Sequence, residues 1–408
     1  MPEVTYGGGG TGGVPNLSGA AFSAFGTLET AELTPLVQLD FIYGINIQTG
    51  VTAASGVAAA VDTNSSRLRL QSGTGAAGSA VFSSRKPARY RPGQGCVARF
   101  TAVFDTAVAN NTQIVGVGGA TDGYFFGYNG TAFGILHRIR TVNTWIAQTS
   151  WNGDKCNGTT SPFTWNPLFG NVMMIKYPYL GYGTIRFYVQ NPVDGTWILC
   201  HTIQYPNTVA TTQASNPALT FYAQQLNSGN LVNKTLYVGS VGIFLSGQRL
   251  FVGSPKWGVD NNKAAVTTEV NILTLQNATT YNGVANAELI RLNHVSFGSD
   301  GATGVSTLRL KLNATLGGTP SYTPVNGATA DNGVTITSGN SVTSFDVAGT
   351  TVTGGLTLFN LTGQNPNSQD VDLTPLDLFI GPAEILTLSV FSTTSGRATV
   401  AVNFTEDI

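Results

Sequence analysis

Apolar and polar positions alternate along most of this chain, which is the period of a half-buried β-strand. Arg67–Gln71 reads Arg-Leu-Arg-Leu-Gln, and the aromatic run 124–128 is closed by the hairpin signal Asn129-Gly130. Up to residue 252 the pattern predicts strands at 36–45, 67–71, 97–104, 113–117, 124–128, 133–139, 171–177, 184–190, 197–204, 219–223, 235–241 and 248–252. About a dozen short strands at this spacing indicate an antiparallel sandwich or jelly roll.

The alternation continues in the last third of the chain, beyond a Gly-Ser-Pro-Lys-Trp-Gly segment at 253–258. Strands are expected there at 266–275, 287–297, 306–313, 333–337, 341–347, 355–360, 384–392 and 398–404. The fold class is therefore all-β, with a jelly-roll or lectin-like sandwich followed by an Ig-like one. We divide the chain into a flexible glycine-rich arm (1–35), a large sandwich (36–252), a linker (253–258) and a C-terminal sandwich (259–408).

Composition supports this plan and adds an expectation about assembly. Charged residues make up 10% of the chain, against about 25% in ordinary soluble proteins, and there are 50 glycines. Helix should be scarce, because Gly, Thr, Asn and Ser favour strands and turns. A net charge of −1 protects a monomer poorly against association, so we expect a homo-oligomer. Residues 1–257 carry 15 Lys+Arg and 9 Asp+Glu, whereas 258–408 carry 5 and 12, as two domains would.

The three cysteines, Cys96, Cys156 and Cys200, are far apart and form no CxxC pair. They fit reduced thiols of a protein assembled in a cytosol, or one disulfide with a spare thiol, and we favour the first. No apolar run approaches the ~18 residues of a membrane span, and the N-terminus lacks a signal-peptide pattern. We expect no membrane partner, and export by cell lysis or a dedicated route.

Five of the 20 basic residues gather in one short stretch beside a Pro-Gly turn: Arg85, Lys86, Arg89, Arg91 and Arg99. Two interpretations compete. The stretch could grip nucleic acid, but the rest of the chain offers few further cations. It could instead form an inter-subunit or inter-domain contact in which arginine forks meet carboxylates. We favour the contact and expect no nucleic-acid partner.

A second cluster combines aromatic and amide or carboxylate side chains in one long polar connection, 145–166. Its members are Trp145, Trp151, Asn152, Asp154 and Trp165. Aromatic platforms beside planar polar groups are suited to binding a sugar, so these residues are the candidate glycan site. The alternative, which we favour, is that the tryptophans plug the end of the sandwich or a subunit interface.

Catalytic and metal-binding patterns are weak. His137, His201 and His294 stand outside any GxSxG or HExxH context. Asp122, Asp154 and Asp194 lie next to glycines in turns, where Asp bonds its own backbone. The segment 152–158 resembles a calcium loop only faintly, because Cys stands where a ligand is needed and no closing Glu follows. We therefore expect no enzyme activity, no cofactor and no metal site.

Several segments resemble a family of β-rich virion proteins found in tailed bacteriophages and some large DNA viruses. The segments are 84–95, 99–104, 122–130, 133–136, 151–154 and 179–183, within about residues 25–250. The part from 269 to 407 separately resembles sandwich modules at the ends of phage structural proteins. The resemblance implies a structural or fibre-like protein of the particle and brings no catalytic residues.

These observations predict a virion structural protein, assembled in the host cytoplasm as a trimer, in a tail, fibre or capsid-surface component. The N-terminal arm is expected to anchor it to other virion proteins. The alternative is a carbohydrate-binding adhesin that recognises a host surface glycan. A glycan depolymerase is less favoured, because no paired carboxylates can be located.

Overall fold

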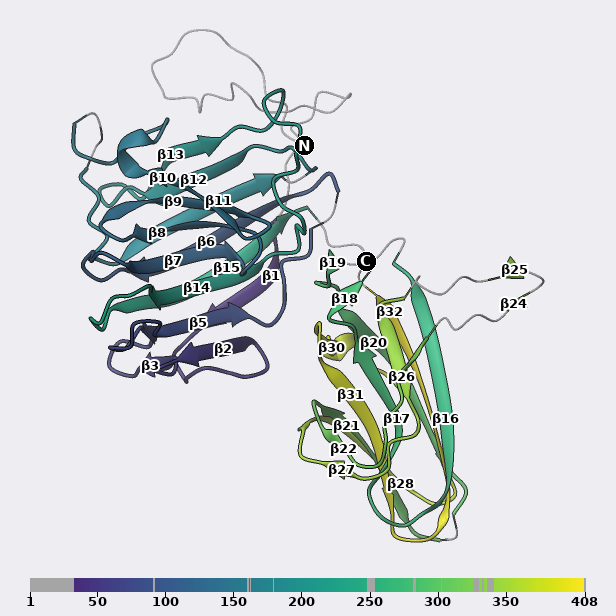
Figure 1. Ribbon diagram of the computed structural model, residues 1–408. Helices are drawn as coiled ribbons and strands as arrows, with labels where there is room; N and C mark the ends of the chain where they lie inside the picture. The colour runs from purple at the N-terminus through teal and green to yellow at the C-terminus, as the bar shows by residue number, and fades with distance from the viewer. Residues whose placement is uncertain are drawn as a thin grey trace, which may run out of the picture.

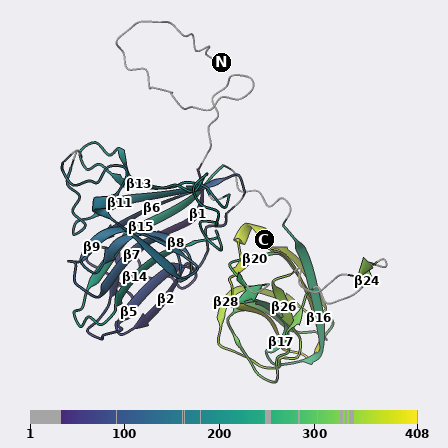
Figure 2. The same ribbon diagram turned by 45° about the horizontal axis from the view of Figure 1, so that its top comes forward.

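The computed structural model describes residues 33–406, apart from 91, 160, 162, 179, 248–253, 282–283, 302, 326–329, 332–333 and 336–340. Within this part the chain is all β, interrupted by two short 3-10 turns, η1 (Gln148–Ser150) and η2 (Thr374–Leu376). Two antiparallel sandwiches lie side by side (Figures 1 and 2). The predicted fold class is confirmed, whereas the predicted arm at 1–35 falls outside the described residues except for Leu33–Pro35.

The first sandwich packs an eight-stranded sheet on a seven-stranded one. The larger sheet has the order β13-β12-β11-β6-β15-β4-β3, with β1 paired to β15. Its strands are β1 (Leu33–Asp40), β3 (Ala60–Asp62), β4 (Arg67–Gln71), β6 (Gly95–Val103), β11 (Asn171–Pro178), β12 (Ile185–Gln190), β13 (Trp197–Ile203) and β15 (Thr235–Ser246).

The smaller sheet runs in the order β10-β9-β8-β7-β14-β5-β2. Its strands are β2 (Gly50–Ser55), β5 (Ser79–Ser84), β7 (Asn111–Gly118), β8 (Gly123–Asn129), β9 (Ala132–Ile139), β10 (Val142–Ala147) and β14 (Thr220–Asn227). Strands β2, β3, β5 and β10 were not predicted: the first three consist mainly of small residues, and β10 overlaps the predicted long connection, 145–166. The core between the sheets is rich in aromatic rings, such as Phe100, Phe126 and Phe221.

The second sandwich begins at Lys256, so part of the predicted linker is strand. One sheet has the order β16-β32-β20-β29, with β30 paired to β20, and the other β23-β26-β17-β31-β21-β28. Their strands are β16 (Lys256–Val266), β17 (Val270–Asn277), β20 (Ile290–Ser299), β21 (Val305–Leu312), β23 (Thr323–Pro324), β26 (Thr343–Asp346), β28 (Leu356–Gln364), β29 (Asn367–Asp372), β30 (Phe379–Ile380), β31 (Ile385–Ser392) and β32 (Gly396–Glu406).

The core of the second sandwich is mainly aliphatic, in contrast to the first. Inward positions of its strands alternate with outward ones, as in β21, where Leu308 and Leu310 are fully buried. Strand β16 was missed because a run of four polar residues, 260–263, interrupts it. It pairs along β32 from Lys256 to Val266 and forms the edge of its sheet.

Candidate functional site

The two sandwiches meet where the basic stretch leaves β5. Arg85 follows the last residue of that strand, and its guanidinium reaches Glu384 with both arms. The Nε–Oε1 distance is 2.7 Å and the Nη2–Oε2 distance 2.5 Å. The same Nη2 donates to the carbonyl of Phe379 at 3.3 Å, and the guanidinium lies 4.5 Å from the centre of that ring. Only 7% of the Arg85 side chain and 16% of the Glu384 side chain are exposed, so little water competes with this pair.

Two further ion pairs extend this contact. Lys86 Nζ lies 2.7 Å from Asp377 Oδ2, and Arg89 pairs with Glu288. Asn216 of the first sandwich also donates to the carbonyl of Ala285 at 3.4 Å. We call the ion pairs of Arg85, Lys86 and Arg89 the domain joint. It is an inter-domain contact within one chain.

The other two residues of the basic stretch lie outside the joint. Arg99 is exposed on β6, and its guanidinium carbon is 5.6 Å from the centre of the Phe244 ring. Arg99 pairs with no carboxylate of the described residues, so the predicted inter-domain contact does not include it within this chain; β6 lies inside the large sheet, between β11 and β15. Arg91 lies outside the described residues.

Cavities at the joint are small. One of about 170 Å³ is lined by Asp122, Asn216 and Asn286, among others, and one of about 230 Å³ lies beside Arg89 and Glu288. Small-molecule sites usually measure about 300–1,000 Å³. The joint is therefore suited to holding two domains together rather than to enclosing a ligand.

The structure does not assemble the predicted glycan-binding face of the tryptophan connection. Trp151 and Trp165 are 2% and 4% exposed and pack edge-on against Phe126 and Phe133 of the core. Trp145 belongs to another cluster, on the opposite face of the small sheet, where it lies against Leu136. The rings cannot act as one stacking platform because they lie on different sides of the sheet.

The polar members of the connection are also engaged. The side chain of Asn152 exchanges two hydrogen bonds of 2.8 Å with the backbone of Thr202. Asp154 accepts from the amide of Cys156 at 2.7 Å and from Ser161. Trp151 and Trp165 match the interpretation that tryptophans plug the sandwich. The carboxylate of the calcium-like segment, Asp154, binds groups of its own loop.

Two of the three histidines are buried in the first sandwich. Burial lowers the pKa of His137, whose Nε2 donates to the carbonyl of Gln213 at 3.0 Å. Burial also lowers the pKa of His201, whose Nδ1 accepts the amide of Asn152 at 3.2 Å. Among the residues that the structure describes, no group of three or more His, Cys, Asp or Glu could hold a metal ion.

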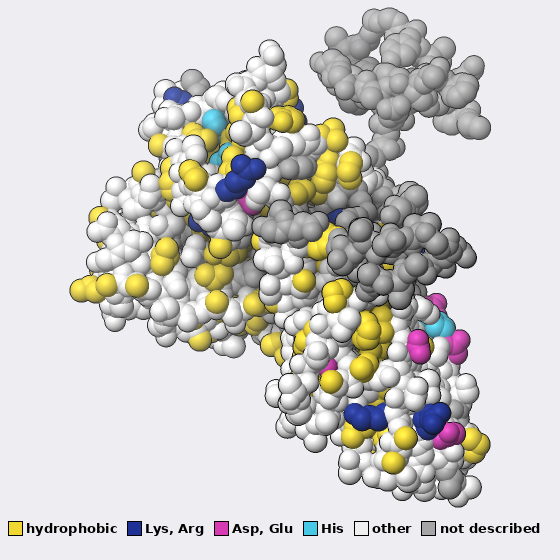
Figure 3. All heavy atoms as spheres, turned by 45° about the vertical axis from the view of Figure 1, so that its right-hand side comes forward, with side chains coloured by type: hydrophobic (Ala, Val, Ile, Leu, Met, Phe, Trp, Pro, Cys, Tyr) yellow, Lys and Arg dark blue, Asp and Glu magenta, His cyan; other side chains and the backbone are white. Residues whose placement is uncertain are grey.

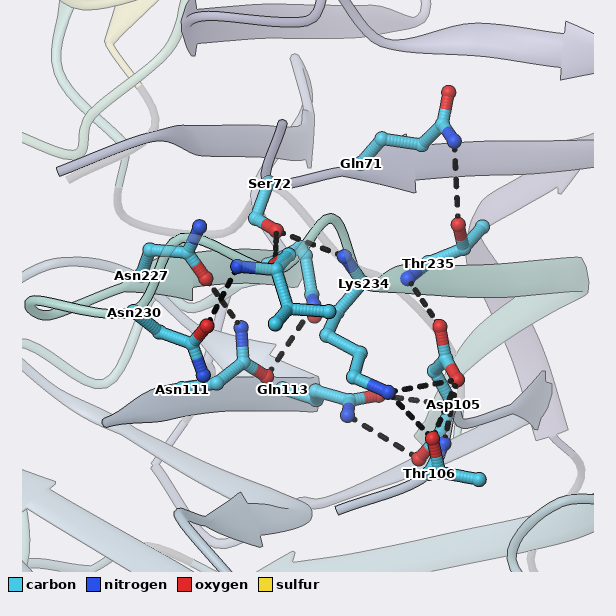
Figure 4. A network of polar contacts seen from close by, with 12 residues as sticks. Gln71, Ser72, Asp105, Thr106, Asn111, Gln113, Asn227, Asn230, Lys234 and Thr235 are labelled. Carbon is cyan, nitrogen blue, oxygen red and sulfur yellow. Dashed lines mark hydrogen bonds and ion pairs between the residues drawn. The ribbon is translucent and has the colours of Figure 1, made fainter. Parts of the chain in front are cut away.

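A polar network closes the end of the first sandwich (Figure 4). The carboxylate of Asp105 accepts from the amide of Thr235 at 2.9 Å and from Lys234 Nζ at 3.4 Å. Gln113 brackets the Asp105 backbone, accepting from its N–H at 2.8 Å and donating to its carbonyl at 3.2 Å. Asn111 donates to Asn227 at 2.9 Å within the same cluster. Because these groups satisfy one another across both sheets, the network stabilises the fold.

The acidic half of the joint, Glu288, Asp377 and Glu384, was not predicted from the sequence. The signal available was the excess of Asp and Glu in 258–408, which gives a sign but no positions. No helix long and apolar enough to cross a membrane occurs in the described ranges.

Comparisons with known proteins found likenesses among solved structures alone. No family model and no curated protein matches this chain. Among solved structures, the carbohydrate recognition domain of Emp47p is 9% identical, with 53% of this chain and 98% of that chain aligned at a TM-score of 0.35. Arcelin-5, a lectin-like defense protein from Phaseolus vulgaris, is 10% identical, with 52% of this chain and 99% of that chain aligned at a TM-score of 0.33. A glycoside hydrolase family protein from Mycobacterium thermorestibile is 10% identical, with 51% of this chain and 100% of that chain aligned at a TM-score of 0.36. At these scores the likenesses carry no argument about function.

Proposed function

We propose that this chain is a structural protein of a virus particle, an oligomeric component of its tail, fibre or capsid surface. The observation that carries the proposal is the domain joint. Domains connected by a linker move relative to one another by default, unless their interface is large and hydrophobic. In this chain we propose that the shielded pair of Arg85 and Glu384, with its two companion ion pairs, restrains that motion, as a structural subunit of a particle requires.

The surface supports assembly. Charged side chains are sparse on the face drawn in Figure 3, where uncharged polar and apolar atoms predominate. The loop between β1 and β2 exposes three large apolar side chains, Ile42 (58%), Tyr43 (100%) and Ile47 (68%). Clustered exposed apolar side chains are typical of protein contacts. We propose that this loop, called the apolar loop below, contributes to contacts between subunits of a trimer.

The oligomeric state of the full chain tests this proposal. Sedimentation and light scattering should give a mass three times that of the chain, and antibodies against the chain should label purified particles. Tyr43→Ser combined with Ile47→Ser should shift the mass toward the monomer. Val193→Ser, at an equally exposed apolar position of another loop, should not. A monomer at every concentration, together with unlabelled particles, would overturn the proposal.

A second candidate is a carbohydrate-binding adhesin on the same particle. It can no longer rest on the tryptophan connection, because those rings are buried or separated. One observation favours it, a basic hollow beside the joint, and its ligand is considered next.

A further inference from the structure

A hollow of about 390 Å³ lies on the outer face of the second sandwich's five-stranded sheet. Three strands bring Lys256, Thr405 and Arg291 into one row, because Thr405 of β32 pairs with Lys256 of β16 and with Arg291 of β20. Directly opposed residues of neighbouring strands project from the same face. Phe404, the neighbour of Thr405, points into the core, so this row faces away from it.

The segment after η2 forms the opposite wall, through Asp377 and Leu378. Asp377 is the C-cap of η2, with a left-handed backbone (φ 47°), and its carboxylate contacts two cations. Arg291 Nη1 donates to Oδ1, and Lys86 of the domain joint donates to Oδ2. The one carboxylate of the lining is therefore already bound from both sides.

Lys256 differs from the other cations of the hollow. It is exposed, and its ammonium makes no hydrogen bond or ion pair with any residue that the structure describes. Lys256 belongs to a sandwich in which carboxylates outnumber cations, so its isolation beside Arg291 is not a consequence of local composition. A lysine without a carboxylate partner at the mouth of a hollow can bind an anion from solution.

The remaining polar groups suit hydroxyls. Asn293 Nδ2 donates to Thr405 Oγ1 at 2.5 Å, which leaves the Thr405 hydroxyl proton directed elsewhere. The Asn293 side-chain oxygen accepts no hydrogen bond from the described residues, and Thr374 adds a second hydroxyl to the lining. Half-buried Leu378 supplies an apolar surface for the C–H face of a ring. A few convergent polar groups over an apolar patch are typical of a small-ligand site.

We propose that this hollow binds an acidic sugar residue, with the sugar carboxylate on Lys256 and its hydroxyls on Asn293, Thr405 and Asp377. The volume fits about one sugar ring, and one unpaired cation matches one carboxylate. A nucleic acid would require several phosphate contacts. The inference rests on the second candidate function, carbohydrate binding, and is independent of any role in a virus particle.

Saturation-transfer NMR and calorimetry on the full chain test the proposal with glucuronic acid, N-acetylneuraminic acid, glucose and inorganic phosphate as probes. Both acidic sugars should bind, and glucose should bind at least about tenfold more weakly, since a charge-assisted hydrogen bond is lost. Lys256→Gln should weaken the acidic sugars by a similar factor. Lys155→Gln, which removes a lysine of the first sandwich, should leave their affinity unchanged.

Each other result overturns the proposal. Equal affinity for glucose and glucuronic acid would indicate carbohydrate binding without a carboxylate site. Phosphate binding as strong as that of the acidic sugars would indicate a bare anion site. Undiminished binding by Lys256→Gln, with its melting temperature unchanged, would place the ligand elsewhere. Binding of no sugar in an array of acidic and neutral glycans would remove the adhesin function, and particle labelling would still decide the structural role.

Discussion

Replacing Arg85 by alanine is expected to release the second sandwich from the first while both stay folded. Arg85 makes two short bonds to Glu384 and one to the carbonyl of Phe379. It packs in neither hydrophobic core. Its loss should therefore act on the arrangement of the domains and on the free energy that couples their unfolding.

The size of the effect follows from the geometry. Each hydrogen bond between charged groups contributes about 1.5–3 kcal/mol, and breaking a buried pair on one side costs about 3–5 kcal/mol. Glu384 is 16% exposed and keeps the amide of Gly381 at 2.6 Å as a donor, so water and backbone compensate part of the loss. We expect a coupling free energy of about 2–3 kcal/mol between Arg85 and Glu384.

A double-mutant cycle measures this coupling. Urea unfolding of Arg85→Ala, Glu384→Ala and the double variant gives the interaction term, and X-ray scattering in solution reports the maximum dimension of the chain. Arg67→Ala is the control, because Arg67 pairs with Asp62 at 3.1 Å within the first sandwich. It should change neither the coupling nor the dimension. A coupling below about 0.5 kcal/mol, the usual limit of additivity, with an unchanged scattering curve would refute the joint as the element that makes the chain rigid.

Three further expectations concern the first sandwich. Trp151→Ala should lower the free energy of unfolding by about 3–5 kcal/mol in urea titrations. Trp145 is half-buried, so Trp145→Ala should lower the free energy of unfolding by clearly less. Equal losses in the two variants would contradict the placement of Trp151 in the core. Burial lowers the pKa of His201 in the folded chain, so on acidification the unfolded chain binds the proton first. The free energy of unfolding should therefore be constant above pH ~6.5 and fall below it. His201→Gln should reduce this pH dependence in melting scans, and an identical dependence would contradict the assignment. Burial raises the pKa of Cys96 to about 12, so roughly one thiol in ten thousand is ionised at pH 8. Iodoacetamide should leave the Cys96 peptide unlabelled in the native protein and label it in urea. Rapid labelling of the native protein would disprove burial.

The alternation of apolar and polar residues was sufficient to predict the fold class, but it did not reveal every strand. Arg67–Gln71 and Thr307–Leu312 alternate large apolar with polar residues, so their strands could be predicted. Strand β16 places Trp257, Val259 and Val266 against the core, but the polar run 260–263 interrupts its apolar positions. The predicted linker, 253–258, therefore overlapped the start of β16, and no strand of the second sandwich was predicted before residue 266.

The site shows the same division between local and long-range information. The concentration of cations at 85–89 marked a contact, because so few charges occur elsewhere. Its partners lie far along the chain, Glu288 199 residues after Arg89, and Asp377 and Glu384 291 and 299 residues after Lys86 and Arg85. They come together only through the folding of the second sandwich. The prediction for the tryptophans failed for a similar reason, because residues of one connection were expected to share one surface. Strand β10 instead places Trp145 on the outer face of the small sheet, and the turn that follows carries Trp151 into the core.

Asp377 links the domain joint to the basic hollow, and this shared residue makes the two proposals interdependent. Its two oxygens are held by Lys86 of the first sandwich and Arg291 of the second. Lys86→Ala removes one cation from the carboxylate, which then attracts Arg291 and Lys256 more strongly and repels an incoming anion. Acidic sugars should consequently bind Lys86→Ala several-fold more weakly, although Lys86 does not line the hollow. Binding free energies are reciprocal, so the ligand should also strengthen the joint and raise the melting temperature of the intact chain more than that of Lys86→Ala. An equal rise in both proteins, with equal affinities, would show that the hollow and the joint act independently.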